Sequence, residues 1–311
     1  MNWILLAVGA QFLNALVAIV DKRIVSDEKM LPNPFVYAFY TCLISGAWIV
    51  IYLVSLIPIS FGGIEVPSFE NIARPTLEVV ALAFLSAYTF FIALVSMFSA
   101  FRKADASDVV PVVGATSAIA SFGLGYFFLG TAISSNFALG IVLLSIGTFL
   151  VSHFHFSVKT ALVSIHSGIF FALHYIAIKG LFMVTSFDDG FFWSRIAFMF
   201  FALSLLMVPS YFEKIKEKTK ATSGHAGLLI FANKVLAGVS TILILKATHL
   251  GDVAVVQALG GLQFVFILFI GIFVSLSPKK IAVGEVYHRE TILQKALFVA
   301  IIALGFLVLF T

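Results

Sequence analysis

Residues 301–310 read IIALGFLVLF, an apolar run without a polar side chain. Strands of a membrane barrel alternate apolar and polar residues, and this run does not. Because only helices and closed barrels satisfy their backbone hydrogen bonds in lipid, the run is predicted to be a transmembrane helix. The whole 311-residue chain has this character, with 61% hydrophobic and 11% charged residues and a mean hydropathy of +1.11. Since about a quarter of the residues of a soluble domain are charged, we predict an all-α polytopic membrane protein.

The lengths of the apolar runs predict about ten transmembrane helices, since one crossing takes about 20 residues. The first run is followed by Asp21-Lys22-Arg23 rather than by small residues, so we interpret it as a transmembrane helix and not as a cleaved signal. Residues 213–220, EKIKEKTK, are the one strongly charged stretch and are predicted to be a solvated loop or a short helical extension. The predicted helices cover residues 2–20, 35–57, 77–100, 108–129, 136–152, 160–181, 190–209, 225–247, 252–276 and 294–310.

An internal repeat relates the two halves of the chain. RKADASDV at residues 102–109 leads into the fourth predicted helix, and KATHLGDV at residues 246–253 leads into the ninth. The aspartates in these segments, Asp108 and Asp252, are 144 positions apart, and both are expected to cap the helices that they begin. With weaker matches elsewhere, the pattern predicts two five-helix units, residues 1–157 and 158–311. Because five is odd, the second unit enters the membrane from the opposite face, which predicts two inverted repeats that can form a cavity between them.

Single residues carry a family resemblance. Lys22 and Lys179 stand at the ends of the first helix of each half, Arg195 lies early in the seventh helix, and Glu290 and Gly305 lie at the start and late in the last helix. In these features the chain resembles the drug/metabolite transporter superfamily, in its ten-helix EamA-like form. The resemblance implies export or uptake of small metabolites, such as amino acids, sugars or amphipathic cations. It also implies two five-helix halves around a central cavity.

Two ionisable residues lie at membrane depth. Lys234, next to Asn233, falls about ten residues into the eighth predicted helix, where a lysine costs several kcal/mol unless it faces protein or water. It could hold an anionic group or carry a proton; alternatively, it snorkels or neutralises a carboxylate structurally. His174 lies near the middle of the sixth helix and could couple transport to protons, because imidazole titrates near neutral pH. A neutral histidine that is hydrogen-bonded to another helix is the alternative.

Four further residues complete the set of candidates for substrate binding or proton coupling. Arg195 could act in the site, or it could be structural and reach the interface by snorkelling. Gln257 and Asn14 could contact a ligand, although buried amides commonly join helices. Trp193 could bind a cation through its ring, or it could belong to the aromatic belt or the packing.

The predicted function is secondary transport of a small metabolite or drug-like molecule by alternating access. The sequence has no P-loop, HExxH or GxSxG motif, and His153 and His155 lack a third convergent zinc ligand. We therefore predict a transporter that is not an enzyme and that has no cofactor and no metal. The alternative is a membrane-embedded enzyme or flippase that acts on a lipid-linked substrate, and a channel is a third reading.

The expected partners are a small-molecule substrate and the lipid bilayer of the cell (inner) membrane, which the multi-pass chain spans. The net charge of +4 does not indicate nucleic acid, because lysine and arginine lie at the ends of apolar runs, as the positive-inside rule expects. Most of these charges lie in the odd-numbered loops, which favours both termini outside, whereas the family resemblance favours both termini inside. The sequence leaves open the substrate, the direction of transport, the coupling ion and the oligomeric state.

Overall fold

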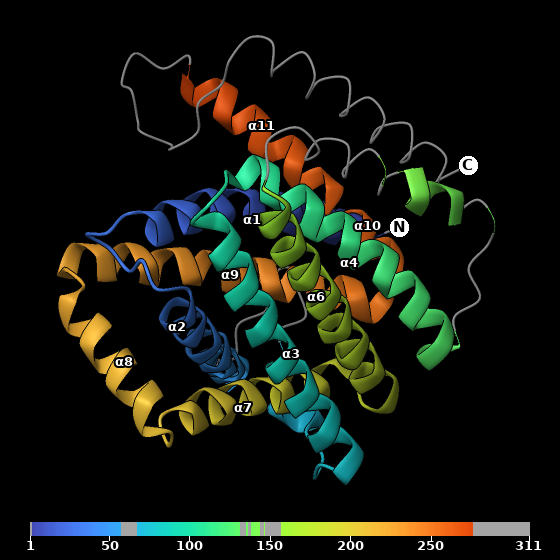
Figure 1. The fold of residues 1–311 in the computed structure, drawn as a ribbon. Coiled ribbons are helices and arrows are strands. Elements are labelled where there is room, and N and C mark those ends of the chain that lie inside the picture. Colours follow the sequence, from blue (N-terminus) through green and yellow to red (C-terminus); the bar gives the residue numbers. More distant parts are fainter. Residues whose placement is uncertain are drawn as a thin grey trace.

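The computed structural model describes residues 2–56, 67–130, 135, 138–143, 146 and 157–275, and the regular structure in these residues is helical (Figure 1). The predicted all-α class is therefore confirmed. The tenth predicted helix and most of the fifth lie outside the described residues. The helices are α1 (Asn2–Ser26), α2 (Pro34–Ala47), the 3-10 helices η1 (Trp48–Leu56) and η2 (Phe69–Asn71), α3 (Leu77–Phe101), α4 (Ala106–Leu129), α6 (Val158–Val184), α7 (Phe187–Leu205), α8 (Pro209–Ala221), α9 (Gly224–Leu250), α10 (Val253–Ala258) and α11 (Gly261–Ser275).

Within the described residues, seven helical segments are long and apolar enough to cross a membrane, and the bent pair of α7 and α8 is an eighth candidate. The prediction of a multi-pass membrane protein is thus confirmed. Several predicted spans differ from the observed helices by a few residues, and the first and the ninth differ most. The first was predicted to end at residue 20, but α1 continues to Ser26. The ninth is broken around Gly260, where an added Cβ would lie 2.7 Å from the carbonyl oxygen of Gln257, so glycine allows the chain to turn between α10 and α11.

Polar side chains cap the starts of most helices by accepting a hydrogen bond from a backbone N–H of the first turn. These capping residues are Asn33, Thr76, Ser157, Ser186, Ser223 and Asp252. Asp252 therefore caps α10 as predicted. The same prediction for Asp108 was wrong, because α4 begins at Ala106 and its N-cap residue is Asp105. Asp108 lies in the first turn of α4 and is buried.

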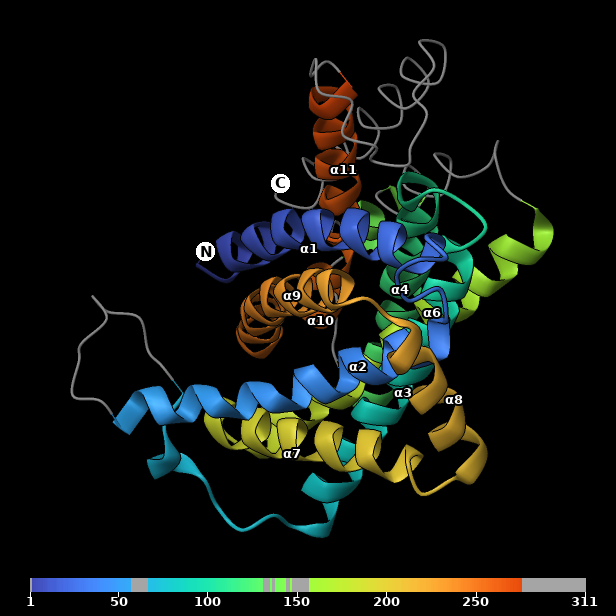
Figure 2. The ribbon, with the colours of Figure 1, turned by 90° about the vertical axis from the view of Figure 1, so that its left-hand side faces the viewer.

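The helices pack in pairs that join distant parts of the chain. α1 lies along α9, α3 lies along α6, and α2 lies beside α7 (Figure 2). Glycines allow the closest approaches: a Cβ at Gly168 in α6 would lie 2.7 Å from the carbonyl oxygen of Val113 in α4, and a Cβ at Gly238 in α9 would overlap the ring of Trp48. α1 contacts α3 and α4 as well as α9, and α6 contacts α3 and α4 as well as α7 and α9. Each of these two helices therefore joins the first and the second part of the chain.

The end of α1 is tied to the break between α3 and α4 by Lys22. Its Nζ donates hydrogen bonds to the carbonyl oxygens of Phe101 at 2.5 Å and Ala104 at 2.8 Å. The same Nζ lies 4.0 Å from a carboxylate oxygen of Asp105. A lysine charge at this place satisfies carbonyl groups that the end of a helix leaves without a partner and opposes the negative end of its dipole.

The end of α6 makes the same contact with the break between α9 and α10. Nζ of Lys179 donates to the carbonyl oxygens of Thr248 at 2.9 Å, His249 at 3.1 Å and Gly251 at 2.8 Å. The bonded positions 101 and 104 correspond to 248 and 251 with a constant shift of 147 residues, and the N-cap residues Asp105 and Asp252 keep that shift. These contacts favour pairing Asp252 with Asp105 rather than with Asp108, and they support the proposed repeat of residues 1–157 and 158–311.

Candidate functional site

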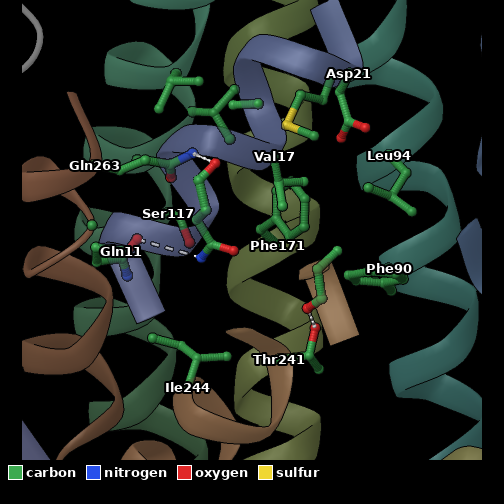
Figure 3. A pocket seen from close by; sticks show the side chains of 18 of the residues that line it. Gln11, Val17, Asp21, Phe90, Leu94, Ser117, Phe171, Thr241, Ile244 and Gln263 are labelled. Carbon is green, nitrogen blue, oxygen red and sulfur yellow. Dashed lines mark hydrogen bonds between the residues drawn. The ribbon is translucent and has the colours of Figure 1, made fainter. Parts of the chain in front are cut away.

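A cavity of about 970 Å³, its open mouth included, lies between α1, α2, α3, α4, α6, α9 and the α10–α11 junction. Figure 3 shows Gln11 and Gln263 on one side of it and Phe90 and Leu94 on the other. Its wall mixes apolar side chains with amides, hydroxyls and two charges. The polar side chains in the wall are Gln11, Asn14, Asp21, Thr41, Ser117, Tyr175, Lys234, Thr241, Gln257 and Gln263.

The charged part of the wall is an ion pair between α1 and α9. Nζ of Lys234 lies 2.7 Å from Oδ1 of Asp21, and each of the two residues is only 3% exposed. Lys234 lies about 15 Å along α9 from its first residue, at a rise of 1.5 Å per residue, so it is far from either end of a helix that is long and apolar enough to cross a membrane. A charged pair in such a place is tolerated only when both members are paired and hydrogen-bonded.

Further donors complete the surroundings of Asp21. Oδ1 also accepts a hydrogen bond from Nδ2 of Asn233 at 2.7 Å and one from the hydroxyl of Tyr37 in α2. Nζ of Lys234 lies 4.2 Å from the centre of the Tyr37 ring and 5.2 Å from the centre of the Phe98 ring, where cation–π attraction helps to stabilise its charge. Asp21 therefore connects three helices, α1, α2 and α9, at the edge of the cavity.

The amides of the wall connect helices as well. The Ser117 hydroxyl donates to Oε1 of Gln257 at 3.2 Å, which joins α4 to α10. Oδ1 of Asn14 accepts a hydrogen bond from Ser240 in α9 at 2.6 Å, and the carbonyl oxygen of Asn14 accepts one from Nε2 of Gln263 in α11 at 3.0 Å. A ligand in the cavity thus meets amides and hydroxyls that already hold the helices together, so its binding can affect how they pack.

The family model of the EamA-like transporter family matches residues 1–153. This part of the chain belongs to that family. The match confirms the resemblance to the drug/metabolite transporter superfamily, and with it the coarser prediction of a membrane transporter. A solved structure described as "Crystal structure of protein" is similar over 98% of this chain and 97% of its own, with a TM-score of 0.64 and 14% identity, so the likeness concerns the fold. No curated protein sequence matches the chain.

Four of the seven candidate residues lie at the cavity. Lys234, Gln257 and Asn14 are part of its wall, and Asn233 binds Asp21 directly. The sequence analysis left open that Lys234 neutralises a carboxylate, and the structure supplies that carboxylate. The same residue also faces the cavity, so the structural and functional readings of Lys234 are compatible.

His174 lies away from the cavity wall, between α6 and α3. Its Nδ1 donates a hydrogen bond to the carbonyl oxygen of Ser86 at 2.9 Å, and its ring packs on Phe90 with 4.9 Å between the ring centres. The residue is 3% exposed. This geometry favours the alternative of a buried histidine that joins two helices.

Arg195 and Trp193 are also outside the cavity wall. Nη1 of Arg195 donates to the carbonyl oxygen of Ser45 in α2 at 3.2 Å, and its guanidinium carbon lies 4.6 Å from the centre of the Phe198 ring. Nε1 of Trp193 donates to the carbonyl oxygen of Ala73 at 3.1 Å, in the segment that leads to α3. Both side chains join α7 to neighbouring segments, which favours a structural role for each.

Asp21 and Tyr37 were not among the site residues predicted from the sequence. The first helix was predicted to end at residue 20 because Asp21-Lys22-Arg23 interrupts the apolar run. A signal was available in the next two residues, Ile24 and Val25, which are apolar and fully buried and thus continue the helix into the protein. The choice of Asp21 as the partner of Lys234 depends on the packing of α1 against α9, which sequence spacing does not reveal.

Proposed function

We propose that this protein is a secondary transporter that carries a small metabolite through the cavity by alternating access. The observation that carries the proposal is the buried pair of Asp21 and Lys234 in the cavity wall. It links α1 from the first proposed repeat to α9 from the second. Transporters of inverted-repeat architecture move one repeat against the other around a site near the middle of the membrane. A contact between the repeats that also faces the substrate is suited to such a movement.

The attraction between Asp21 and Lys234 depends on both charges, so a substrate or a proton that binds either member can weaken it. Protonation of Asp21, or a substrate group bound to either member, weakens the attraction that joins α1 to α9. An equilibrium between two conformations shifts only when a ligand interacts differently with the two. Asp21 and Lys234 supply that difference if the pair is closed in one conformation and open to ligand in the other.

The wall of the cavity defines the kind of substrate that we expect. The paired charges leave no net charge between Asp21 and Lys234, and the remaining polar groups are amides and hydroxyls that can donate and accept hydrogen bonds. Phe90 and Phe171 offer apolar contact. The expected substrate is therefore a small molecule with both a polar and an apolar part.

Transport by the purified protein in proteoliposomes tests the proposal. Candidate substrates are first selected by thermal shift in detergent, because a ligand that binds the folded state raises its stability. Uptake is then measured for the parent protein, Asp21→Asn and Lys234→Met, with Lys29→Met, an exposed lysine in a loop, as the control. We expect both pair variants to lose transport at least tenfold and the control to keep it. Parent-like uptake by Asp21→Asn and Lys234→Met would show that the ion pair has no part in transport.

A further inference from the structure

The short helix α8 lies at a corner of the molecule, between α7 and α9. α7 and α8 meet at an angle of 96°, after a break of three residues. Figure 2 shows α8 running across the end of the bundle, beside the start of α2. If α7 crosses the bilayer, a helix at this angle lies parallel to the membrane surface, at the level of the lipid headgroups.

The charges of α8 are arranged around one buried residue, Ile215. In a helix with 3.6 residues per turn, Lys214 and Lys218 lie on one flank of Ile215 and Lys216 on the other, whereas Lys220 lies about 140° away, beside Glu213. Nζ of Lys218 lies 3.2 Å from a carboxylate oxygen of the exposed Glu217. Glu213 and Glu217 lie on the face opposite Ile215. The face of Ile215 packs on the protein, so the lysines lie on the exposed sides of α8, from which a lysine side chain can reach lipid headgroups.

Large apolar side chains next to these lysines are exposed. Met207 is 83% exposed, and Val208, Tyr211 and Phe212 are each at least 40% exposed. In an integral membrane protein, aromatic and apolar side chains at the end of a crossing helix fit the boundary between acyl chains and headgroups. The corner thus presents an apolar part to lipid tails and a basic part to headgroups.

The inner side of α8 holds the ends of two other helices. The Tyr211 ring packs on Phe35 with 4.8 Å between the ring centres, and the hydroxyls of Thr219 and Tyr40 lie 2.6 Å apart. Thr222, at the end of α8, donates to the carbonyl oxygen of Met30 at 3.4 Å. Because Phe35 and Tyr40 belong to α2 and the chain enters α9 directly after Thr222, α8 bridges the starts of α2 and α9.

We propose that α8 is an interfacial helix that binds the headgroups of anionic phospholipids through Lys214, Lys216, Lys218 and Lys220. Negative surface charge attracts basic segments within about one Debye length. Phosphate groups would lie along both lysine flanks, while Phe212 and Met207 enter the acyl boundary. The helices that α8 bridges, α2 and α9, hold Tyr37 and Lys234, both partners of Asp21. The proposal concerns lipid binding and stands independently of transport.

The test uses the full-length protein in nanodiscs. Cys42, the one cysteine, is replaced by alanine, and Phe212→Cys is labelled with a polarity-sensitive fluorophore. Nanodiscs contain phosphatidylcholine alone or with phosphatidylglycerol. We expect a blue shift of the emission with phosphatidylglycerol that is lost at high salt. The same label at Ile119→Cys, an exposed position in the middle of α4, is the control and should not respond.

Charge variants show whether the four lysines cause the response to phosphatidylglycerol. Each lysine near an anionic surface strengthens binding roughly fivefold. Replacing all four by glutamine should therefore lower the preference of the protein for phosphatidylglycerol over phosphatidylcholine at least tenfold. Replacing all four by arginine should keep it, which separates charge from folding. A response to phosphatidylglycerol that persists in the glutamine variant, or an emission that is the same in both lipids, would overturn the proposal.

Discussion

The ends of α1 and α6 share a lysine contact but differ in the residue that precedes it. Lys22 and Lys179 each bind the carbonyl groups at the break between two other helices. Before Lys22 stands Asp21, which binds Lys234 in α9, whereas before Lys179 stands Ile178, which is fully buried among apolar side chains. We interpret the shared contact as part of the scaffold. Only the end of α1 carries a buried acidic residue beside its lysine, which makes Asp21 the residue to test first.

The largest expected effect comes from breaking the ion pair. Lys234→Met leaves the buried carboxylate of Asp21 without its cation, and Asp21→Asn leaves the buried ammonium of Lys234 without its anion. Removing one member of such a pair costs about 3–5 kcal/mol of unfolding free energy. The double variant Asp21→Asn/Lys234→Met carries no uncompensated charge and should recover most of that loss. Chemical denaturation in detergent measures all three; additive losses in the double variant would show that the two charges do not depend on each other.

The contacts of Lys22 and Lys179 should contribute equally to the free energy of unfolding. Lys22→Met and Lys179→Met each remove hydrogen bonds from a charged donor to backbone carbonyls, and such bonds contribute about 1.5–3 kcal/mol. The additional 4.0 Å approach of Lys22 to the partly exposed Asp105 adds little, because solvent screens it. We therefore expect the two variants to lose similar stability in the same denaturation experiment. A large loss at one end with none at the other would end the interpretation of a shared scaffold.

Much of the fold could be predicted from the sequence because lipid imposes one strong rule. Apolar runs of sufficient length must be helices, so residues 77–100 and 225–247 were placed within a few residues of α3 and α9. Lys234 was placed at membrane depth for the same reason. The partner of Lys234 was not predicted, because Asp21 is 213 residues away and its burial depends on how α1 packs against α9.

Helix ends and polar contacts were harder to predict from the sequence. A charged triplet lowers hydropathy whether or not the helix continues, so the end of α1 was placed too early. For His174, composition cannot distinguish a titrating imidazole from one that binds a backbone carbonyl; the hydrogen bond to Ser86 depends on the position of α3. The charged stretch at residues 213–220 was compatible with a loop or a short helix. The structure shows that it belongs to the helix α8, which is bent from α7.

Two neutral side chains that join helices, Asn233 and His174, offer a smaller comparison. Asn233 joins α9 to α1 through Asp21, and His174 joins α6 to α3 through Ser86. A hydrogen bond to a charged group contributes about 1.5–3 kcal/mol and an ordinary one about 1 kcal/mol, so Asn233→Leu should lose more stability than His174→Leu. Only Asn233→Leu should also lower the rate of transport in proteoliposomes, because it changes the surroundings of Asp21. Equal loss of transport in both variants would place His174 in the transport step as well.

The smallest expected effect separates the cavity wall from the rest of the core. Ser117 and Ser164 are both buried serines, but Ser117 donates to Gln257 in the wall, whereas Ser164 donates to the carbonyl oxygen of Thr160 in its own helix. Ser117→Ala and Ser164→Ala should each cost about 0.5–1 kcal/mol, because one neutral hydrogen bond is lost. In Ser117→Ala, Oε1 of Gln257 loses its donor beside the cavity, so the KM for transport should change a few-fold, while Ser164→Ala keeps the parent value. A KM that is unchanged in both variants would mean that the substrate does not reach the α4–α10 wall and binds in another part of the cavity.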